Sequence, residues 1–222
     1  KVGAEAEFTG HMLEVTLGPG MLSKNYDGLQ NDLDKMEGVF LKRGEYTYPL
    51  DKERVWHFVP LVKVGDKVEA STWLGQVDEN FQPLKIMAPF TLKGTCTVEY
   101  IADEGDYKIE DRMAVLKDEE GNLIDVNMIQ RWPVKRAMKN YKEKPRPFKL
   151  LETGVRVIDT VNPIVEGGTG FIPGPFGTGK TVLQHAISKQ AEADIVIIAA
   201  CGERANEVVE IFTEFPELVD PH

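Results

Sequence analysis

The chain has few cysteines, no long apolar run and no recognisable leader. Its 222 residues include two cysteines, too few for the disulfide framework of a small secreted protein, so a reducing cytoplasm is the expected compartment. The longest apolar run, Ile195–Cys201, is far shorter than the roughly 20 residues of a membrane-spanning helix. No charged and then apolar stretch follows Lys1, so no signal peptide is expected. These absences argue against a disulfide-rich secreted domain and an integral membrane protein.

Positively charged residues are outnumbered by negatively charged ones. Lysine and arginine number 26 against 36 aspartates and glutamates, which leaves a formal net charge of −10 and a pI near 5.0. A nucleic-acid binder neutralises phosphates with clustered Lys and Arg, so this balance argues against that class of partner. The exception is the basic, proline-rich segment 131–149. Its first interpretation is a solvated linker and its second an RNA- or lipid-facing patch.

What the chain does contain is an ordinary globular composition, 42% hydrophobic and 28% charged, over a length that allows one large domain or two small ones. From about residue 32 to residue 126 the pattern is one of short alternating strands. Within it, Gly65–Glu69 (GDKVE) is echoed by Gly105–Glu110 (GDYKIE), and each copy precedes an apolar cluster. A glycine–aspartate turn that leads into a strand, occurring twice, predicts two β-halves packed face to face with pseudo-twofold symmetry.

Lys85 lies between the two halves and is a candidate for a prosthetic group, because lipoyl and biotinyl carrier domains are built from two such halves. Carriers present their lysine at an exposed hairpin tip, usually within Met-Lys-Met or Asp-Lys-Ala. Here Ile86 and Met87 have the pattern of core residues, and Pro89 ends the strand. We therefore expect Lys85 to be an unmodified residue of a structural domain.

The remainder of the chain follows a different pattern. We expect a short strand at Phe171–Ile172, a helix over Lys180–Gln190, a buried strand at Ile195–Ala200 and a second helix over Asn206–Phe215, ended by Pro216. This alternation is half of a doubly wound α/β domain, in which helices cover a parallel sheet.

Between that first strand and the first helix lies Gly174–Thr181, GPFGTGKT. Its glycines allow backbone N–H groups to approach a polyphosphate closely, and the positive end of the following helix faces the same point. Lys180 is expected to reach the β- and γ-phosphates, and Thr181 to offer its hydroxyl to Mg²⁺. The predicted contacts of a bound nucleoside triphosphate are Gly174, Pro175, Phe176, Gly177, Thr178, Gly179, Lys180, Thr181 and Val182.

Hydrolysis needs a group that orients the attacking water, and Cys201–Arg204 (CGER) follows the second predicted strand. Ligands of open α/β sheets collect at the carboxyl ends of strands. Glu203 is therefore a candidate catalytic base, with Arg204 as its charge partner. A glutamate here also suits the first turn of a helix, where it interacts with the helix dipole, so both interpretations stay open. Cys201 is interpreted as a small apolar filler.

Together these motifs resemble the catalytic A subunit of V-type and archaeal-type rotary ATPases. The resemblance rests on GPFGTGKT, on IIAACGERANEVVE at Ile197–Glu210, on TGVRVID and on QRWPVKR, and it extends over essentially the whole chain. F-type catalytic subunits share the TG-x-x-VID and GER elements, but their loops are closer to GGAGVGKT and they lack an insertion like residues 32–126. Pro175 and Thr178 stand where eukaryotic members commonly have Ala and Cys, which indicates a bacterial or archaeal member.

The resemblance implies a fold class of α/β plus all-β, a partial P-loop, RecA-like nucleotide-binding domain with an inserted β-rich, lipoyl-like bulge domain. It implies ATP or ADP and Mg²⁺ as ligands, with Lys180 and Thr181 binding MgATP and Glu203 activating water. The implied activity is ATP hydrolysis or synthesis coupled to H⁺ or Na⁺ transport. Its partners would be B subunits in an alternating A3B3 ring, a central rotor stalk and a peripheral stalk bound by the bulge. The complex would lie on the cytoplasmic face of the membrane, with no direct membrane insertion of this chain.

Within that family the chain divides into four segments. Residues 1–31 are a strand and loop of the core nucleotide-binding domain, 32–126 the inserted β-domain, 127–149 the basic linker and 150–222 the truncated first part of the P-loop domain. Family members are much longer, and their arginine finger comes from the neighbouring B subunit. The chain alone is therefore expected to hydrolyse ATP barely or not at all.

Two other hypotheses stay open. A hexameric secretion ATPase or RNA helicase of related fold would share the loop but has no evident use for the β-insertion, and stimulation of turnover by single-stranded RNA would identify it. Alternatively, the β-domain acts as a binding module that docks a stalk protein, which a pull-down with residues 32–126 tests.

Overall fold

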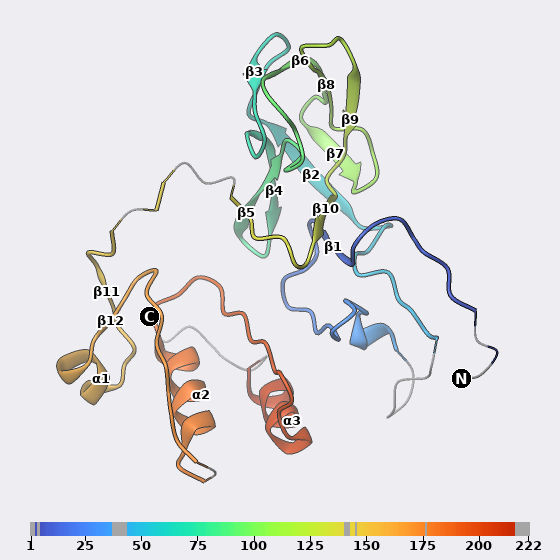
Figure 1. The fold of residues 1–222 in the computed structure, drawn as a ribbon. Coiled ribbons are helices and arrows are strands. Elements are labelled where there is room, and N and C mark those ends of the chain that lie inside the picture. Colours follow the sequence, from blue (N-terminus) through green and yellow to red (C-terminus); the bar gives the residue numbers. More distant parts are fainter. Residues whose placement is uncertain are drawn as a thin grey trace. The chain divides into compact units, whose positions relative to one another are not determined.

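The computed structural model describes residues 3, 5–36, 44–139, 143, 144, 146–175 and 177–215 (Figure 1). The chain separates into two compact units, residues 1–142 and residues 143–222. Within the described ranges, no helix is both long and apolar enough to cross a lipid bilayer.

Two four-stranded antiparallel sheets make up most of the first unit (Figure 1). One sheet has the order β5-β4-β2-β7 and consists of β2 (Val55–Pro60), β4 (Trp73–Glu79), β5 (Gln82–Met87) and β7 (Gly105–Lys108). The other has the order β3-β6-β8-β9 and consists of β3 (Lys67–Val68), β6 (Cys96–Ile101), β8 (Ala114–Lys117) and β9 (Leu123–Val126).

The two sheets correspond strand by strand. The run β5-β4-β2 of one sheet matches β9-β8-β6 of the other, and each sheet is completed by a strand from the opposite half, β7 or β3. The predicted pseudo-twofold symmetry is therefore confirmed. The Gly-Asp pairs differ, because Gly65-Asp66 precedes β3 at a turn, whereas Gly105-Asp106 lies inside β7 and does not form the second turn expected from the sequence. Exchange of β3 and β7 ties the halves together, because neither sheet is complete without a strand from the other half.

Side chains alternate between buried and exposed along the strands, and the buried ones form the hydrophobic core. In β2, Trp56 and Phe58 are buried while Val55 and His57 are exposed, as expected when successive side chains point to opposite faces. The buried apolar side chains form two clusters. One contains Leu50, Trp56, Phe58, Val77, Ile86, Ala102, Ile109, Met113 and Met128, and the other Val68, Leu74, Ala88, Cys96, Val98, Ala114, Leu116 and Val126.

Lys85 lies within β5 and not at a hairpin tip. Its Nζ is 5.2 Å from the centroid of the Trp73 ring and donates a hydrogen bond to Gln76 Oε1. The tip of the β4–β5 hairpin is instead formed by Asn80 and Phe81, and the Phe81 side chain is 95% exposed. Lys85 is thus held by contacts with side chains of the neighbouring strand β4, as expected for an unmodified structural residue.

The beginning and end of the first unit pair with each other. β1 (Glu14–Leu17) is antiparallel to β10 (Gln130–Pro133), and a short 3₁₀ helix covers Leu33–Lys35. β10 lies inside the segment 127–149, so the start of that basic segment is a paired strand and not a solvated linker. The reason is that β1 satisfies its backbone hydrogen-bonding groups. The four segment boundaries stay a prediction.

The described part of the second unit contains three helices and one short antiparallel strand pair. β11 (Leu150–Leu151) pairs antiparallel with β12 (Ile164–Val165), and α1 (Arg156–Val161) lies between them in the chain. α2 (Lys180–Gln190) and α3 (Ala205–Glu214) follow (Figure 1). The helix predicted over 180–190 is confirmed with the same bounds, and the second predicted helix is shifted by one residue at each end. Pro216, expected to end it, lies outside the described residues.

The two strands predicted next to these helices are not formed. Residues 171–172 and 195–200 have no regular secondary structure, and Phe171 and Ile197 are 87% and 88% exposed. A buried parallel strand requires hydrogen-bonded neighbours and cover on both faces. Among the described residues neither segment pairs with another strand. The β-branched pattern alone was therefore not sufficient to form a strand.

Candidate nucleotide-binding site

The glycine-rich loop leads directly into α2. Gly179 is the residue before the helix and has φ +81°, a left-handed conformation that side-chain-bearing residues rarely adopt, and Lys180 is the first residue of the helix. The N–H of Leu183 donates to the carbonyl of Gly179 at 2.9 Å. The first free N–H groups of α2 therefore lie next to Lys180 and Thr181, as a phosphate site requires.

The loop closes on itself through two side chains. Lys180 Nζ donates to the carbonyl oxygen of Gly174 at 2.6 Å, and Thr178 Oγ1 donates to that of Pro175 at 2.8 Å. A Cβ atom at Gly174 would lie 2.6 Å from Thr178 Oγ1, so a larger residue would push the loop open. The lysine ammonium thus links the two ends of the described loop.

The predicted nucleotide contacts differ in their surroundings. Gly174, Pro175, Gly177, Thr178, Gly179 and Lys180 are exposed, Thr181 is half-buried, and Val182 is 73% exposed. Phe176 lies outside the described residues. Because most of the loop is exposed, it is open to a ligand from solution.

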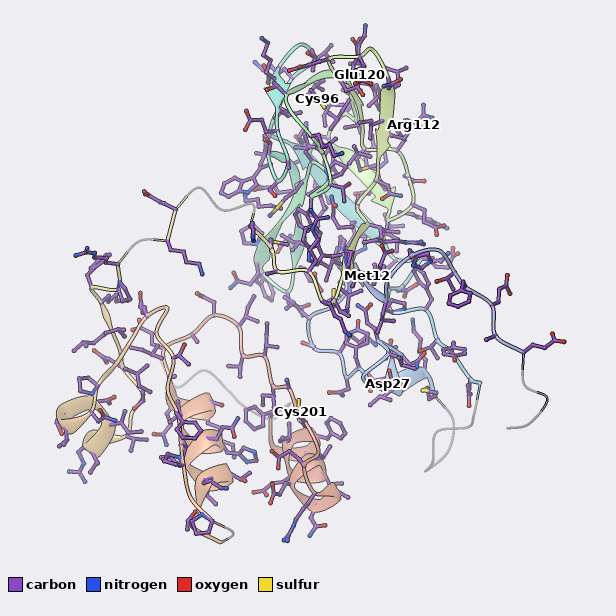
Figure 2. The ribbon with its side chains drawn as sticks, viewed as in Figure 1. Met12, Asp27, Cys96, Arg112, Glu120 and Cys201 are labelled. Carbon is purple, nitrogen blue, oxygen red and sulfur yellow. The ribbon has the colours of Figure 1, made fainter. Side chains whose placement is uncertain are left out.

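Glu203 and Arg204 lie immediately before α3. Arg204 is the residue before the helix, and its carbonyl accepts from the N–H of Val208 at 3.1 Å. Glu203 is exposed, and no hydrogen bond or ion pair joins it to the loop within the described part of the chain. Its role as a base stays a prediction. Cys201, labelled in Figure 2, is exposed and is therefore not the apolar filler expected from the sequence.

Glu207 is a site residue that the sequence analysis did not single out. Thr181 Oγ1 donates to Glu207 Oε2 at 3.2 Å, and both side chains are half-buried. The contact links the predicted Mg²⁺ ligand to the first turns of α3. The signal was its place in the predicted helix over Asn206–Phe215, because Glu207 is the acidic residue in the first turn of α3.

A second motif supports the far end of α2. In the TGVRVID stretch, the N–H and the hydroxyl of buried Thr153 donate to Asp159 Oδ1 at 3.0 and 2.7 Å, and these bonds lower the pKa of Asp159. The N–H of Glu192, just beyond α2, donates to the carbonyl of Glu152 at 3.2 Å. The motif therefore helps to fix the helix that begins with the loop.

The described residues contain no cluster of three or more His, Cys, Asp or Glu side chains placed to hold a metal ion by themselves. A cation at the loop would therefore need ligands from a bound nucleotide, as Mg²⁺ commonly does. The hydroxyl of Thr181 and the nearby carboxylate of Glu207 are oxygen donors of the kind that Mg²⁺ prefers.

Two family models match the chain. The ATPsynthase alpha/beta subunit barrel-sandwich domain matches residues 47–135, and the nucleotide-binding domain of the ATP synthase alpha/beta family matches residues 154–219. The first range contains both four-stranded sheets, and the second contains the loop, α2 and α3.

Three relatives carry the name V-type ATP synthase alpha chain. The protein from Treponema denticola is 52% identical over 224 residues, that from Borrelia hermsii 50% over 223, and that from Borreliella burgdorferi 48% over 223. These alignments cover 99 to 100% of this chain but 38 to 39% of each relative. The chain therefore spans well under half the length of the relatives it matches.

Proposed function

Because the chain belongs to the ATP synthase alpha/beta family, we propose that it is part of the catalytic subunit of a rotary, ion-translocating V- or A-type ATPase. The observation that carries the proposal is the loop itself, with Lys180 and Thr181 at the start of α2. The names of its relatives support the assignment to the V-type alpha chain. The ligand that fits the loop is ATP or ADP with Mg²⁺.

Lys180 would bind the nucleotide by replacing its present hydrogen-bond acceptor, a backbone carbonyl, with phosphate oxygens. Its ammonium leaves the carbonyl of Gly174 and interacts with the β- and γ-phosphates, while the loop N–H groups bind their oxygens. Thr181 would give a hydroxyl lone pair to Mg²⁺ and keep donating its proton to Glu207. When bound, Mg²⁺ neutralises charge that develops on the phosphates.

Glu203 would orient the attacking water, with Arg204 as its charge partner. The support is their place directly before α3, whose first turns contact Thr181 through Glu207. The arginine finger of the family belongs to a neighbouring subunit, and such a residue contributes about 10³–10⁵ to the rate. Turnover would therefore require the assembled ring.

The proposed assembly is an alternating ring with B subunits around a central rotor stalk, on the cytoplasmic face of a membrane. The β-domain, with its two four-stranded sheets, would contact the peripheral stalk. Retention of stalk subunits by the β-domain in a pull-down supports this contact, and loss of all stalk subunits contradicts it.

The test of the catalytic proposal uses the natural full-length subunit assembled with its ring partners. MgATP affinity and turnover are compared for the wild type, Lys180→Ala and Glu203→Gln. We expect Lys180→Ala to lose affinity and Glu203→Gln to keep affinity while turnover falls by roughly 10²–10⁴. Unchanged turnover in Glu203→Gln would place the base elsewhere.

A further inference from the structure

The faces that α2 and α3 present to each other have the same spacing. In α2, Thr181, His185 and Lys189 follow one another at four-residue intervals, so they share one face of the helix. In α3 and at its end, Glu207, Ile211 and Phe215 have the same spacing, and all three are half-buried. His185 is the one buried side chain of α2, with 8% of its surface exposed.

Side-chain contacts at three positions join these faces. Near the start of both helices, Thr181 donates to Glu207. Further along, the rings of His185 and Phe215 pack edge to face, with centroids 5.7 Å apart and planes at 86°. Lys189 Nζ also lies 5.7 Å from the centroid of the Phe215 ring. The order of the contacts means that the helices run in the same direction.

Each helix carries one part of the proposed site at its N-terminal end. α2 begins with Lys180, and α3 begins directly after Glu203 and Arg204. If α3 rotates or slides relative to α2, Glu203 moves relative to the phosphates. Because an edge-to-face ring pair has a preferred orientation, it restricts such motion more than an aliphatic contact of similar size.

We propose that the His185–Phe215 pair positions α3 so that Glu203 faces the nucleotide bound at the start of α2. His185 and Phe215 are thus positioning residues that act through Glu203 and do not touch the substrate. This inference rests on the function proposed above. It assigns to the ring pair an effect on the chemical step that is separate from nucleotide binding, since neither ring belongs to the loop.

The experiment compares His185→Leu, which removes the ring but keeps apolar volume, with His185→Phe, which keeps a ring. Both are made in the full-length subunit and assembled with its ring partners, and kcat, KM and affinity for MgATP are measured. We expect His185→Leu to lower kcat about 10- to 100-fold, as a small misplacement of a catalytic group does, with affinity unchanged within about twofold. We expect His185→Phe to restore most of kcat.

Phe215→Leu tests the same contact from α3 and serves if His185→Leu does not assemble. We expect the double variant His185→Leu/Phe215→Leu to be no slower than either single variant, because one ring already removes the pair. Additive losses, a parallel fall in affinity and kcat, or an unchanged kcat would overturn the positioning role. Lys180→Ala is measured beside them. If it keeps full affinity and turnover, the proposed function itself is wrong and the positioning role falls with it.

Discussion

Several side chains of the first unit occupy positions that are conformationally or electrostatically demanding. Phe81 has φ +65° and is almost fully exposed, while Asn80 before it has φ +51°. Two positive φ values at a two-residue hairpin are typical of a type I′ turn, which favours Asn-Gly. Glu79, one residue earlier, is 2% exposed and accepts bonds from the N–H groups of Gly20 and Leu22, both at 2.9 Å.

Phe81→Gly should stabilise the first unit. Glycine adopts the left-handed conformation without the clash of a Cβ atom, and the exposed ring makes little contact that would be lost. We expect a gain of about 0.5–1 kcal/mol in the free energy of unfolding, measured in urea. Phe81→Ala is the control, because alanine keeps the strain. Equal stability of the glycine and alanine variants would show that φ at Phe81 is not strained.

Glu79→Ala should destabilise the same unit. It leaves the N–H groups of Gly20 and Leu22 without their acceptor in a half-buried place. Since hydrogen bonds to a charged group are worth more than neutral ones, we expect a loss of roughly 2 kcal/mol in the free energy of unfolding. Glu79→Gln keeps an acceptor oxygen and should lose less. A glutamine variant as unstable as the alanine variant would contradict this account.

At the level of elements, pairs of strands are joined by side chains as well as by backbone hydrogen bonds. His57 of β2 faces Asp106 of β7, and its Nδ1 is 2.9 Å from Asp106 Oδ1, while Nε2 is 3.4 Å from Glu104 Oε1. The hydrogen bonds to Asp106 and then Glu104 raise the pKa of His57 above its ordinary value of 6.5. The charged imidazole therefore ties β2 to the start of β7.

This pairing makes stability depend on pH. Because the pKa of His57 is raised in the folded state, the stabilisation that charged His57 contributes to folding is complete below pH 6.5. It is lost as the pH rises through the folded-state pKa. We expect the urea concentration at the unfolding midpoint of the wild type to decrease as the pH is raised from 6.5 to about 8, and His57→Gln to remove that part of the pH dependence. Asp106→Asn should have the same effect. A pH profile that is identical in His57→Gln and wild type would exclude this role.

At the level of the whole molecule, apolar burial is unevenly distributed. Every buried apolar side chain among the described residues belongs to the first unit, whereas Thr153 and His185 are the buried residues described in the second. Apolar burial is the main favourable contribution to folding. The two units should therefore differ in local stability.

Amide hydrogen exchange should reveal this difference. We expect slow exchange in β4, β6 and β8, which lie inside their sheets, and fast exchange over residues 195–200, which have no strand partner. The measurement is exchange followed by mass spectrometry on the 222-residue chain. Strong protection of residues 195–200 would mean that this segment forms a strand in solution.

The chain by itself should not turn over ATP at a useful rate. The proposed mechanism needs an arginine from a neighbouring subunit, whose loss removes about 10³–10⁵ in rate. We expect phosphate release by the purified chain to equal that of its Lys180→Ala variant. A rate near about one per second, in the range of ordinary enzymes, that disappears in Lys180→Ala would contradict the prediction.

Short contiguous motifs were enough to predict much of the fold and the resemblance to a family. GPFGTGKT predicted the loop and the start of α2, and the repeated Gly-Asp pattern predicted the two halves of the β-domain, although its second copy lies in β7 and not in a turn. The predicted fold class and the resemblance to V-type catalytic subunits are both confirmed by the family models and the relatives. Local backbone geometry and local chemistry depend on neighbours in sequence, so they were readable there.

Other features depend on residues far apart in the chain. The Thr181–Glu207 bond, the His185–Phe215 pair and the exchange of β3 and β7 between sheets require elements to meet in space. The coil at residues 195–200 has the same origin, because a strand forms only when another strand accepts its hydrogen bonds. The sequence determined the glycine-rich loop and the helix that follows it. The tertiary structure decided which side chains contact that loop and helix, because packing depends on partners that are far apart in the chain.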